Sequence, residues 1–282
     1  MTLDVRAGEG LDAEYHADSS AAWSAAKVIR VVGELARRNL YAMLRIPGTV
    51  IPVVVMPIFL VLAFSGAFGA LDRLPGYPAP DILDWMVPYA IVQGSAFAGL
   101  GAAFSAGRDL EGGFFDRLLV SPSPRFALVA GPVVYSALRP LLPMAIVLPL
   151  GLLGGARLRG GLLGFASLVV ASVGTAVAAA LWGLGVVYRT RTQRSGGLVQ
   201  VGILLTLFLS TVQVPLDLMT GWLHAVARVN PMTNVLRLAR EGFLGPVTWD
   251  QTWGGLVALA CGWILLGWFA WRGLKQLEIG KS

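Results

Sequence analysis

The sequence predicts an all-α membrane protein with six transmembrane helices, preceded by an amphipathic helix on the membrane surface. Two observations lead to this fold class. Only 13% of the 282 residues are charged while 56% are hydrophobic, whereas a typical soluble domain carries about a quarter of charged residues. Uncharged intervals also recur at the length of about 20 residues that a helix needs to cross roughly 30 Å of hydrocarbon. A soluble enzyme is therefore not expected.

Six apolar intervals supply the predicted spans. Five of them contain no charged residue, and the third contains only Arg139. The third interval also carries four prolines, which free helical carbonyls, so this span should be kinked or broken. The expected spans cover residues of about 47–71, 86–106, 127–154, 162–188, 197–215 and 252–271.

The chain before the first span divides into a tail and a helix. Residues 1–22 hold five acidic residues and one arginine without an apolar period, which predicts a disordered acidic tail. Between Lys27 and Arg45, six charged side chains fall within an arc of about 100° on a helix. Such a cationic helix should lie along the membrane surface. The alternative is a helix packed on a soluble partner.

Basic residues indicate the orientation, because Lys and Arg favour cytoplasmic loops. With the N-terminus inside, the inner segments hold 15 of these residues and the outer loops hold 6. This bias predicts a multi-pass protein with both termini in the cytoplasm. Arg157 and Arg159 lie on the wrong side by this rule.

The residues offer no visible catalytic or metal site. His16 lies in the acidic tail, His224 is isolated, and the single Cys261 cannot build a metal cluster. No Walker A motif occurs, so ATP that drives this protein must be bound by another chain. The basic residues flank apolar spans rather than forming a patch, which argues against nucleic acid as a partner.

The predicted inner loop between the second and third spans mixes charged and aromatic residues. Phe114 and Phe115 stand beside Asp116 and Arg117, which predicts a short amphipathic helix that ends before Ser121. A charged and aromatic knob is suited to docking into a groove on a cytoplasmic partner. The alternative is a solvated loop lying on the membrane.

The predicted outer stretch, residues 217–250, contains helices too short to span a bilayer. Asn230 is placed to cap a helix whose first residue is Pro231, and the pair Gly245 and Pro246 should end it. Arg237 and Glu241 have the i,i+4 spacing of an ion pair. These helices either rest at the outer interface or dip partway into the membrane.

Arg139 is the candidate residue of a translocation path. An arginine near the bilayer centre costs about 2.5 to 3.5 kcal/mol, so such residues are functional candidates. A helix starting at Phe126 places Arg139 about 20 Å along the span. Its expected partners are carbonyls freed by Pro143, pore water or the anionic head group of a substrate. Alternatively the span begins later and Arg139 snorkels to the inner interface.

Taken together, these motifs resemble those of the permease subunits of type-2 ABC exporters, in particular the daunorubicin-resistance branch. The resemblance extends from about Trp23 to the C-terminus. It rests on the six spans and on four short motifs: Asp109-Leu-Glu-Gly-Gly-Phe-Phe-Asp-Arg-Leu-Leu, Ser-Pro-Ser-Pro-Arg125, Gly221-Trp-Leu and Asn230-Pro-Met-Thr233.

The resemblance implies a membrane subunit of an ATP-driven exporter in the bacterial plasma membrane. Its partners would be two copies of an ABC ATPase that bind ATP and Mg, and a second copy or a similar permease. Its substrate would be a lipid or an amphiphilic drug, polyketide or glycolipid. The amphipathic helix would lie beside the ATPase. The implied ATPase-coupling loop contains Asp109, Glu111, Phe114, Phe115, Asp116 and Arg117, and the implied outer re-entrant hairpin contains Trp222, Asn230, Pro231, Thr233 and Arg237.

Two other functions compete with this interpretation. An ion-coupled secondary transporter would be expected to carry ionisable residues near the midplane and an internal repeat. Acidic residues and histidines are absent from the six apolar intervals, which argues against it. An intramembrane lipid-modifying enzyme would need a nucleophile with a base in reach, and the sequence shows no such pair.

Overall fold

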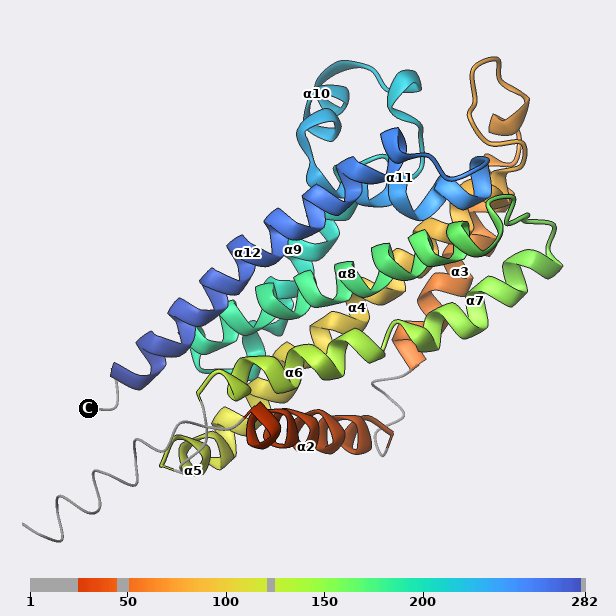
Figure 1. Cartoon of the computed structure of the whole chain (residues 1–282). Helices are drawn as coiled ribbons and strands as arrows, with labels where there is room; N and C mark the ends of the chain where they lie inside the picture. The colour runs from red at the N-terminus through yellow and green to blue at the C-terminus, as the bar shows by residue number, and fades with distance from the viewer. Residues whose placement is uncertain (1–24, 45–50, 121–124, 280–282) are drawn as a thin grey trace, which may run out of the picture.

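The computed structural model describes residues 25–44, 51–120 and 125–279, and this part of the chain consists of helices and connecting turns without strands (Figure 1). The all-helical prediction is confirmed for these residues. The predicted acidic tail, Arg45 and the Ser121–Pro124 segment lie outside the described residues.

In the described part of the chain, the helices follow one another through turns and three short 3-10 segments. The 3-10 segments are η2 (Leu71–Arg73), η3 (Gln193–Ser195) and η4 (Leu216–Leu218). The α-helices are α2 (Ala25–Leu44), α3 (Ile51–Phe68), α4 (Ile82–Glu111), α5 (Phe114–Val120), α6 (Ala127–Leu138), α7 (Leu141–Leu153), α8 (Gly161–Thr190), α9 (Gly196–Phe208), α10 (Gly221–Val229), α11 (Pro231–Leu244) and α12 (Trp249–Ile279).

Among the described residues, four helical segments are long and apolar enough to cross a membrane: α4, the combined α6 and α7, α8 and α12. The third predicted span is indeed interrupted, because α6 ends at Leu138 and α7 begins at Leu141. Helix α3 is apolar but shorter, and α9 has only 13 residues, or about 20 Å. Helix α9 also stops at Phe208, well before the predicted end at residue 215.

The long helices run between two ends of the molecule (Figure 1). One, called the α5 end here, carries α5, the turn η3 and the C-terminal part of α12. The other, called the α10 end, carries α10, α11 and the turn between α7 and α8. Helix α2 lies beside α6 toward the α5 end, where Ala36 and Met43 pack against Tyr135. Its bounds agree with the predicted amphipathic helix.

Helices α4 and α8 form the centre of the bundle. Val87, Ala90 and Ile91 of α4 are completely buried. In contrast, α12 exposes Ile264 and Leu265. Exposed side chains of this kind suit a surface that faces lipid.

Helix α11 packs unusually closely against α8. A Cβ atom added to Gly164 of α8 would lie 2.6 Å from the Cα of Gly242 in α11. The backbone N–H of Gly160 also donates to the carbonyl of Gly242 over 2.7 Å. Two glycines are required here because any side chain would push the helices apart.

The chain after α9 is irregular but buried, and Arg240 of α11 satisfies its backbone. Arg240 is 1% exposed. Its guanidinium donates to the carbonyls of Thr211, Val212 and Trp85 over 2.6, 2.8 and 3.1 Å. The Trp85 indole N–H also donates to Val212. Buried irregular backbone needs such partners, so α9 can end early at Phe208.

Candidate functional site

A bidentate ion pair ties α2 to α4 at the α5 end. Arg38 of α2 donates to the two carboxylate oxygens of Asp109 over 2.6 and 2.9 Å. This hydrogen bond raises the pKa of Arg38 above its ordinary value. The same guanidinium lies 3.9 Å from the ring centre of Phe114, the first residue of α5. One side chain therefore joins α2, α4 and α5.

Glu111 joins α4 to the turn between α8 and α9. Its carboxylate accepts a hydrogen bond from the backbone N–H of Gln193 over 2.8 Å and from the Thr192 hydroxyl over 2.9 Å. Helix α4 is about 45 Å long, so Glu111 lies at its exposed end, beyond the predicted span 86–106. The two hydrogen bonds hold the pKa of Glu111 below its ordinary value. This predicted coupling residue thus has partners within its own chain.

The predicted amphipathic helix of the inner loop is α5, and its two faces differ. Phe115 is 3% exposed and packs against Tyr188 of α8, with ring centres 5.6 Å apart. Asp116 and Arg117 are exposed on the surface of the molecule. The aromatic residues therefore anchor α5 to the bundle, while Arg117 is available to a partner.

A cavity of about 660 Å³ opens beside α5's neighbours, α2 and α4. Helices α2, α3, α4 and α9 supply most of its wall, for example Met43, Phe59, Phe97 and Leu204. The cavity is also lined by polar residues: Arg108 from α4, Tyr135 from α6, Gln200 from α9, and Arg139.

Arg139 stands between α6 and α7 and is 5% exposed. Its Nη1 donates to the carbonyl of Ala98 in α4 over 2.9 Å, and its guanidinium lies 5.4 Å from the ring centre of Tyr135. The helical segment of the third span begins at Ala127, which argues against the alternative in which the span starts later and Arg139 snorkels to the interface. This carbonyl belongs to α4 and is not one of the carbonyls that Pro143 was expected to free.

Gly101 of α4 makes room for this arginine. A Cβ atom added to Gly101 would overlap Nη1 of Arg139 and lie 2.8 Å from its Cζ. Gly101 and Arg139 both line the cavity. The absence of a side chain at residue 101 thus sets where the guanidinium lies.

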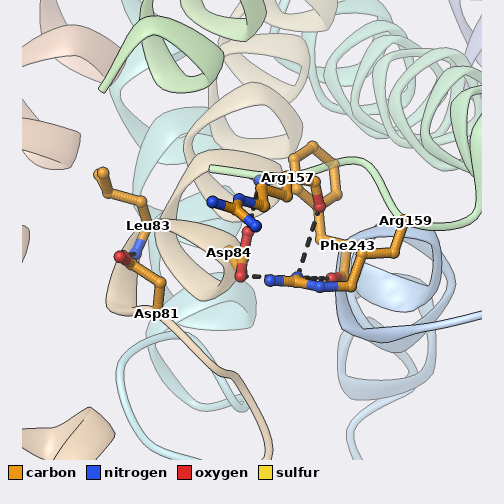
Figure 2. Close-up of polar contacts among 6 residues, drawn as sticks. All are labelled: Asp81, Leu83, Asp84, Arg157, Arg159 and Phe243. Atoms are coloured by element: carbon orange, nitrogen blue, oxygen red, sulfur yellow. Dashed lines mark hydrogen bonds and ion pairs between the residues drawn. The ribbon is translucent and has the colours of Figure 1, made fainter. Parts of the chain in front are cut away.

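At the α10 end, an ion pair with a buried carboxylate joins three elements, as Figure 2 shows. Asp84 of α4 is completely buried and accepts from Arg159 Nη1 and from the backbone N–H of Arg157, each over 2.7 Å. Arg159 also donates to the carbonyl of Phe243 at the end of α11. This pairing explains why Arg159 can lie in a predicted outer loop, where basic residues are disfavoured: Asp84 balances its charge within the protein.

Asn230 fixes the hairpin of α10 and α11. Its side-chain oxygen accepts from the backbone N–H of Met232 over 2.9 Å, which confirms the predicted cap before Pro231. Its amide nitrogen donates to the carbonyls of Thr206 and Leu209 at the end of α9. The buried Thr233 donates to the carbonyl of Ala227. Trp222, by contrast, is 71% exposed.

The predicted ion pair between Arg237 and Glu241 is wrong. Glu241 is 1% exposed and accepts from the backbone N–H of Thr248 and the hydroxyl of Thr252. Arg237 is exposed. The carboxylate is used instead to hold the start of α12 against α11, because it lies on the buried face of α11.

Comparison with known proteins now identifies the family. The model of the ABC-2 type transporter family matches residues 30–244. The daunorubicin resistance ABC transporter permease protein DrrB1 of Streptomyces coeruleorubidus is 31% identical over 218 residues, which are 76% of this chain and 75% of that protein. A family match over this much of the chain, together with several apolar helices, leads to one conclusion: the chain belongs to the ABC-2 type transporter family and is an ABC transporter permease.

Proposed function

We propose that this chain is the membrane subunit of an ATP-driven exporter that moves an amphiphilic or hydrophobic compound, and that a separate ATPase docks on α5. The proposal rests on one observation: Asp109 and Glu111, which lie next to α5, each bind a segment that forms or adjoins a wall of the same cavity. Asp109 holds α2 through Arg38, and Glu111 holds the turn before α9. Helices α2 and α9 both line the cavity.

This connectivity gives a route from ATP to the substrate. An ATPase that closes on ATP and Mg would push or pull α5 through its exposed face. Because α5 is anchored by Phe115 and adjoins Asp109 and Glu111, its displacement would shift α2 and α9 together. The cavity would then change shape. Coupling of this kind needs a discrete second arrangement of the packed helices.

The same proposal sets the topology. We infer six crossings, in which α3 and α9 join the four longer segments, with the α5 end and both termini in the cytoplasm. The hairpin of α10 and α11 would enter the outer leaflet without crossing it. Support comes from Asn230 and Arg240, which bind the hairpin to carbonyls at and just after the end of α9, the one at Val212 being buried.

Topology is tested with single cysteines in a Cys261→Ala background. Arg117→Cys should react with a membrane-impermeant maleimide only from the cytoplasmic side, and Trp222→Cys only from outside. Labelling of both from the same side would contradict the proposed crossings.

Docking and transmission are separated by two substitutions, assayed with the cognate ATPase. Arg117→Glu should abolish co-purification of the ATPase, because it reverses an exposed charge on α5. Glu111→Gln should keep co-purification and vanadate-sensitive ATP hydrolysis but reduce transport. Arg272→Glu, an exposed charge reversal on α12, is the matched control and should change neither. Failure of the native chain to bind any ATPase would refute the proposal.

A further inference from the structure

The cavity beside α4 combines apolar walls with positive charge. Of its described lining residues, Arg108 and Arg139 are cationic and none is acidic. Tyr135 and Gln200 add polar groups, and the remaining lining is dominated by aliphatic and aromatic side chains such as Met56 and Phe104. Two like charges that share one low-dielectric cavity repel each other, and an anion between them would offset this repulsion.

The two arginines lie at different depths. Arg108 is exposed near the α5 end of α4, and Arg139 lies against Gly101, seven residues earlier on that helix. Seven residues correspond to about 10 Å along the helix axis. A ligand entering from the α5 end would therefore meet Arg108 first and Arg139 deeper in the bundle.

The surrounding residues fix the position of the Arg139 side chain. Its guanidinium is buried, is fixed by the Ala98 carbonyl, and rests on a glycine that leaves space for it. Gln93 lies on the same face of α4 as Phe97, one helical turn further from the α5 end, and is completely buried. Its side-chain amide atoms have no hydrogen-bond partner among the described residues. Buried polar groups without partners are rare and call for an explanation.

We propose that this cavity binds an amphiphile whose compact anionic group, a carboxylate or a phosphate, is held by Arg108 and Arg139 while its apolar tail lies against α3. The inference rests on the proposed exporter function and specifies its substrate class. The volume falls in the range of about 300 to 1,000 Å³ typical of ligand sites. Arginine forms strong charge-assisted hydrogen bonds with both anions. A cationic amphiphile would meet repulsion in the same place.

Binding can be measured on the purified full-length chain in phosphatidylcholine nanodiscs. The probe is a fatty acid with a fluorescent conjugated chain, compared with its methyl ester and with the amine of the same chain. The acid should bind at least about tenfold more tightly than the ester, which reflects one charged hydrogen-bonded contact. The amine should bind more weakly than the ester.

Variants assign the preference to the cavity. Arg108→Gln, an exposed substitution that should not disturb folding, and Arg139→Gln should each weaken binding of the acid about tenfold but leave the ester unchanged. Gly101→Ala keeps both charges but displaces the guanidinium of Arg139, so it should also weaken binding of the acid and leave binding of the ester unchanged. Arg272→Gln and Gly197→Ala, whose added Cβ meets nothing within 4 Å, are the matched controls.

The source of the anion is distinguished with a fluorescent phosphatidic acid of matched tail. Tighter binding of this lipid than of the free acid identifies a membrane lipid, and the reverse identifies a free carboxylate-bearing compound; either result supports the anionic site. Equal affinity for acid, ester and amine would overturn it, as would an acid preference that Arg108→Gln and Gly101→Ala leave intact. Co-purification with the ATPase is scored separately, so the exporter function can stand when the anionic site fails.

Discussion

The two ends of the molecule are held together by polar contacts of opposite kinds. At the α5 end, the side chains of Arg38 and Asp109 are 42% and 18% exposed, and Glu111 is exposed. At the α10 end, Asp84 is completely buried although the side chain of its partner Arg159 is 31% exposed, and Arg240 is 1% exposed. Exposed ion pairs can exchange with water at little cost, whereas breaking a buried pair is expensive. The contacts at the α5 end can therefore rearrange more easily, while those of the α10 end hold its elements together as one unit.

The largest effect is expected at Arg240. The substitution Arg240→Met keeps the apolar stem but removes the guanidinium donor from the carbonyls of Trp85, Thr211 and Val212. The Val212 carbonyl keeps the hydrogen bond from the Trp85 indole N–H. Each buried group that loses its hydrogen bond costs about 1 to 3 kcal/mol, so the variant should lose about 3 kcal/mol of stability. Its melting temperature in detergent and its yield in membranes should both fall sharply. Arg237→Met, three residues earlier but exposed, should match the native protein; equal melting of all three proteins would contradict the fixed α10 end.

The pair of the buried Asp84 and the partly exposed Arg159 should come next. Asp84→Leu leaves Arg159 and the backbone N–H of Arg157 without their carboxylate, which costs about 2 kcal/mol. Adding Arg159→Leu removes the stranded charge, so the double variant should be less destabilised than the two single losses added together. Unfolding in denaturant, read for the four proteins of this cycle, gives the coupling energy. Arg157→Gln should be neutral, because only its backbone N–H contacts Asp84; a coupling energy near zero would remove the pair's proposed role.

The exposed pair at the α5 end should matter much less for stability. Arg38→Gln and Asp109→Asn should each lower stability by about 0.5 to 1 kcal/mol, and the two together by little more. This loss should shrink in high salt, since ions screen exposed charges. Melting temperatures at low and high salt provide the measurement. A loss as large as that of Asp84→Leu would erase the contrast between the two ends.

The smallest effect is a local titration at Glu111. Its folded pKa is lowered by the N–H of Gln193 and the Thr192 hydroxyl. The stabilising contact is therefore fully present above the ordinary pKa of glutamate and is lost as the pH falls through the lower, folded pKa. The amide resonance of Gln193 in nuclear magnetic resonance spectra should shift with a midpoint below that ordinary value. In Glu111→Gln the shift should disappear; a midpoint at the ordinary value would show that the hydrogen bonds do not form.

Local features of the sequence predicted local structure well. The arc of charged residues after Lys27 predicted helix α2, and Asn230 with Pro231 predicted the start of α11. The prolines of the third span predicted the break between α6 and α7. These features depend on neighbouring residues, which a pattern can read. The same holds for α5, whose exposed and anchored faces follow from its alternation of charged and aromatic side chains.

Contacts between distant residues could not be predicted in this way. The early end of α9 depends on Arg240, which lies 28 residues beyond Val212, so a hydropathy pattern extends the span too far. The pair of Arg237 and Glu241 was wrong because spacing alone ignores which face of α11 is buried. One signal was available: the position of Arg159 against the charge rule marked a residue that needed a buried partner. For Gly101, one of 35 glycines, the sequence offered no signal that it contacts Arg139.

The contact between Gly164 and Gly242 has a mechanical consequence. Helix α8 is 30 residues long, or about 45 Å, and it touches α11 without intervening side chains near its first turn. Its last turn leads directly into Thr192 and Gln193, the partners of Glu111. A shift of α8 along its own axis would therefore carry α11 with it. The molecule thus possesses a rigid rod that links the α5 end to the α10 end without passing through the cavity.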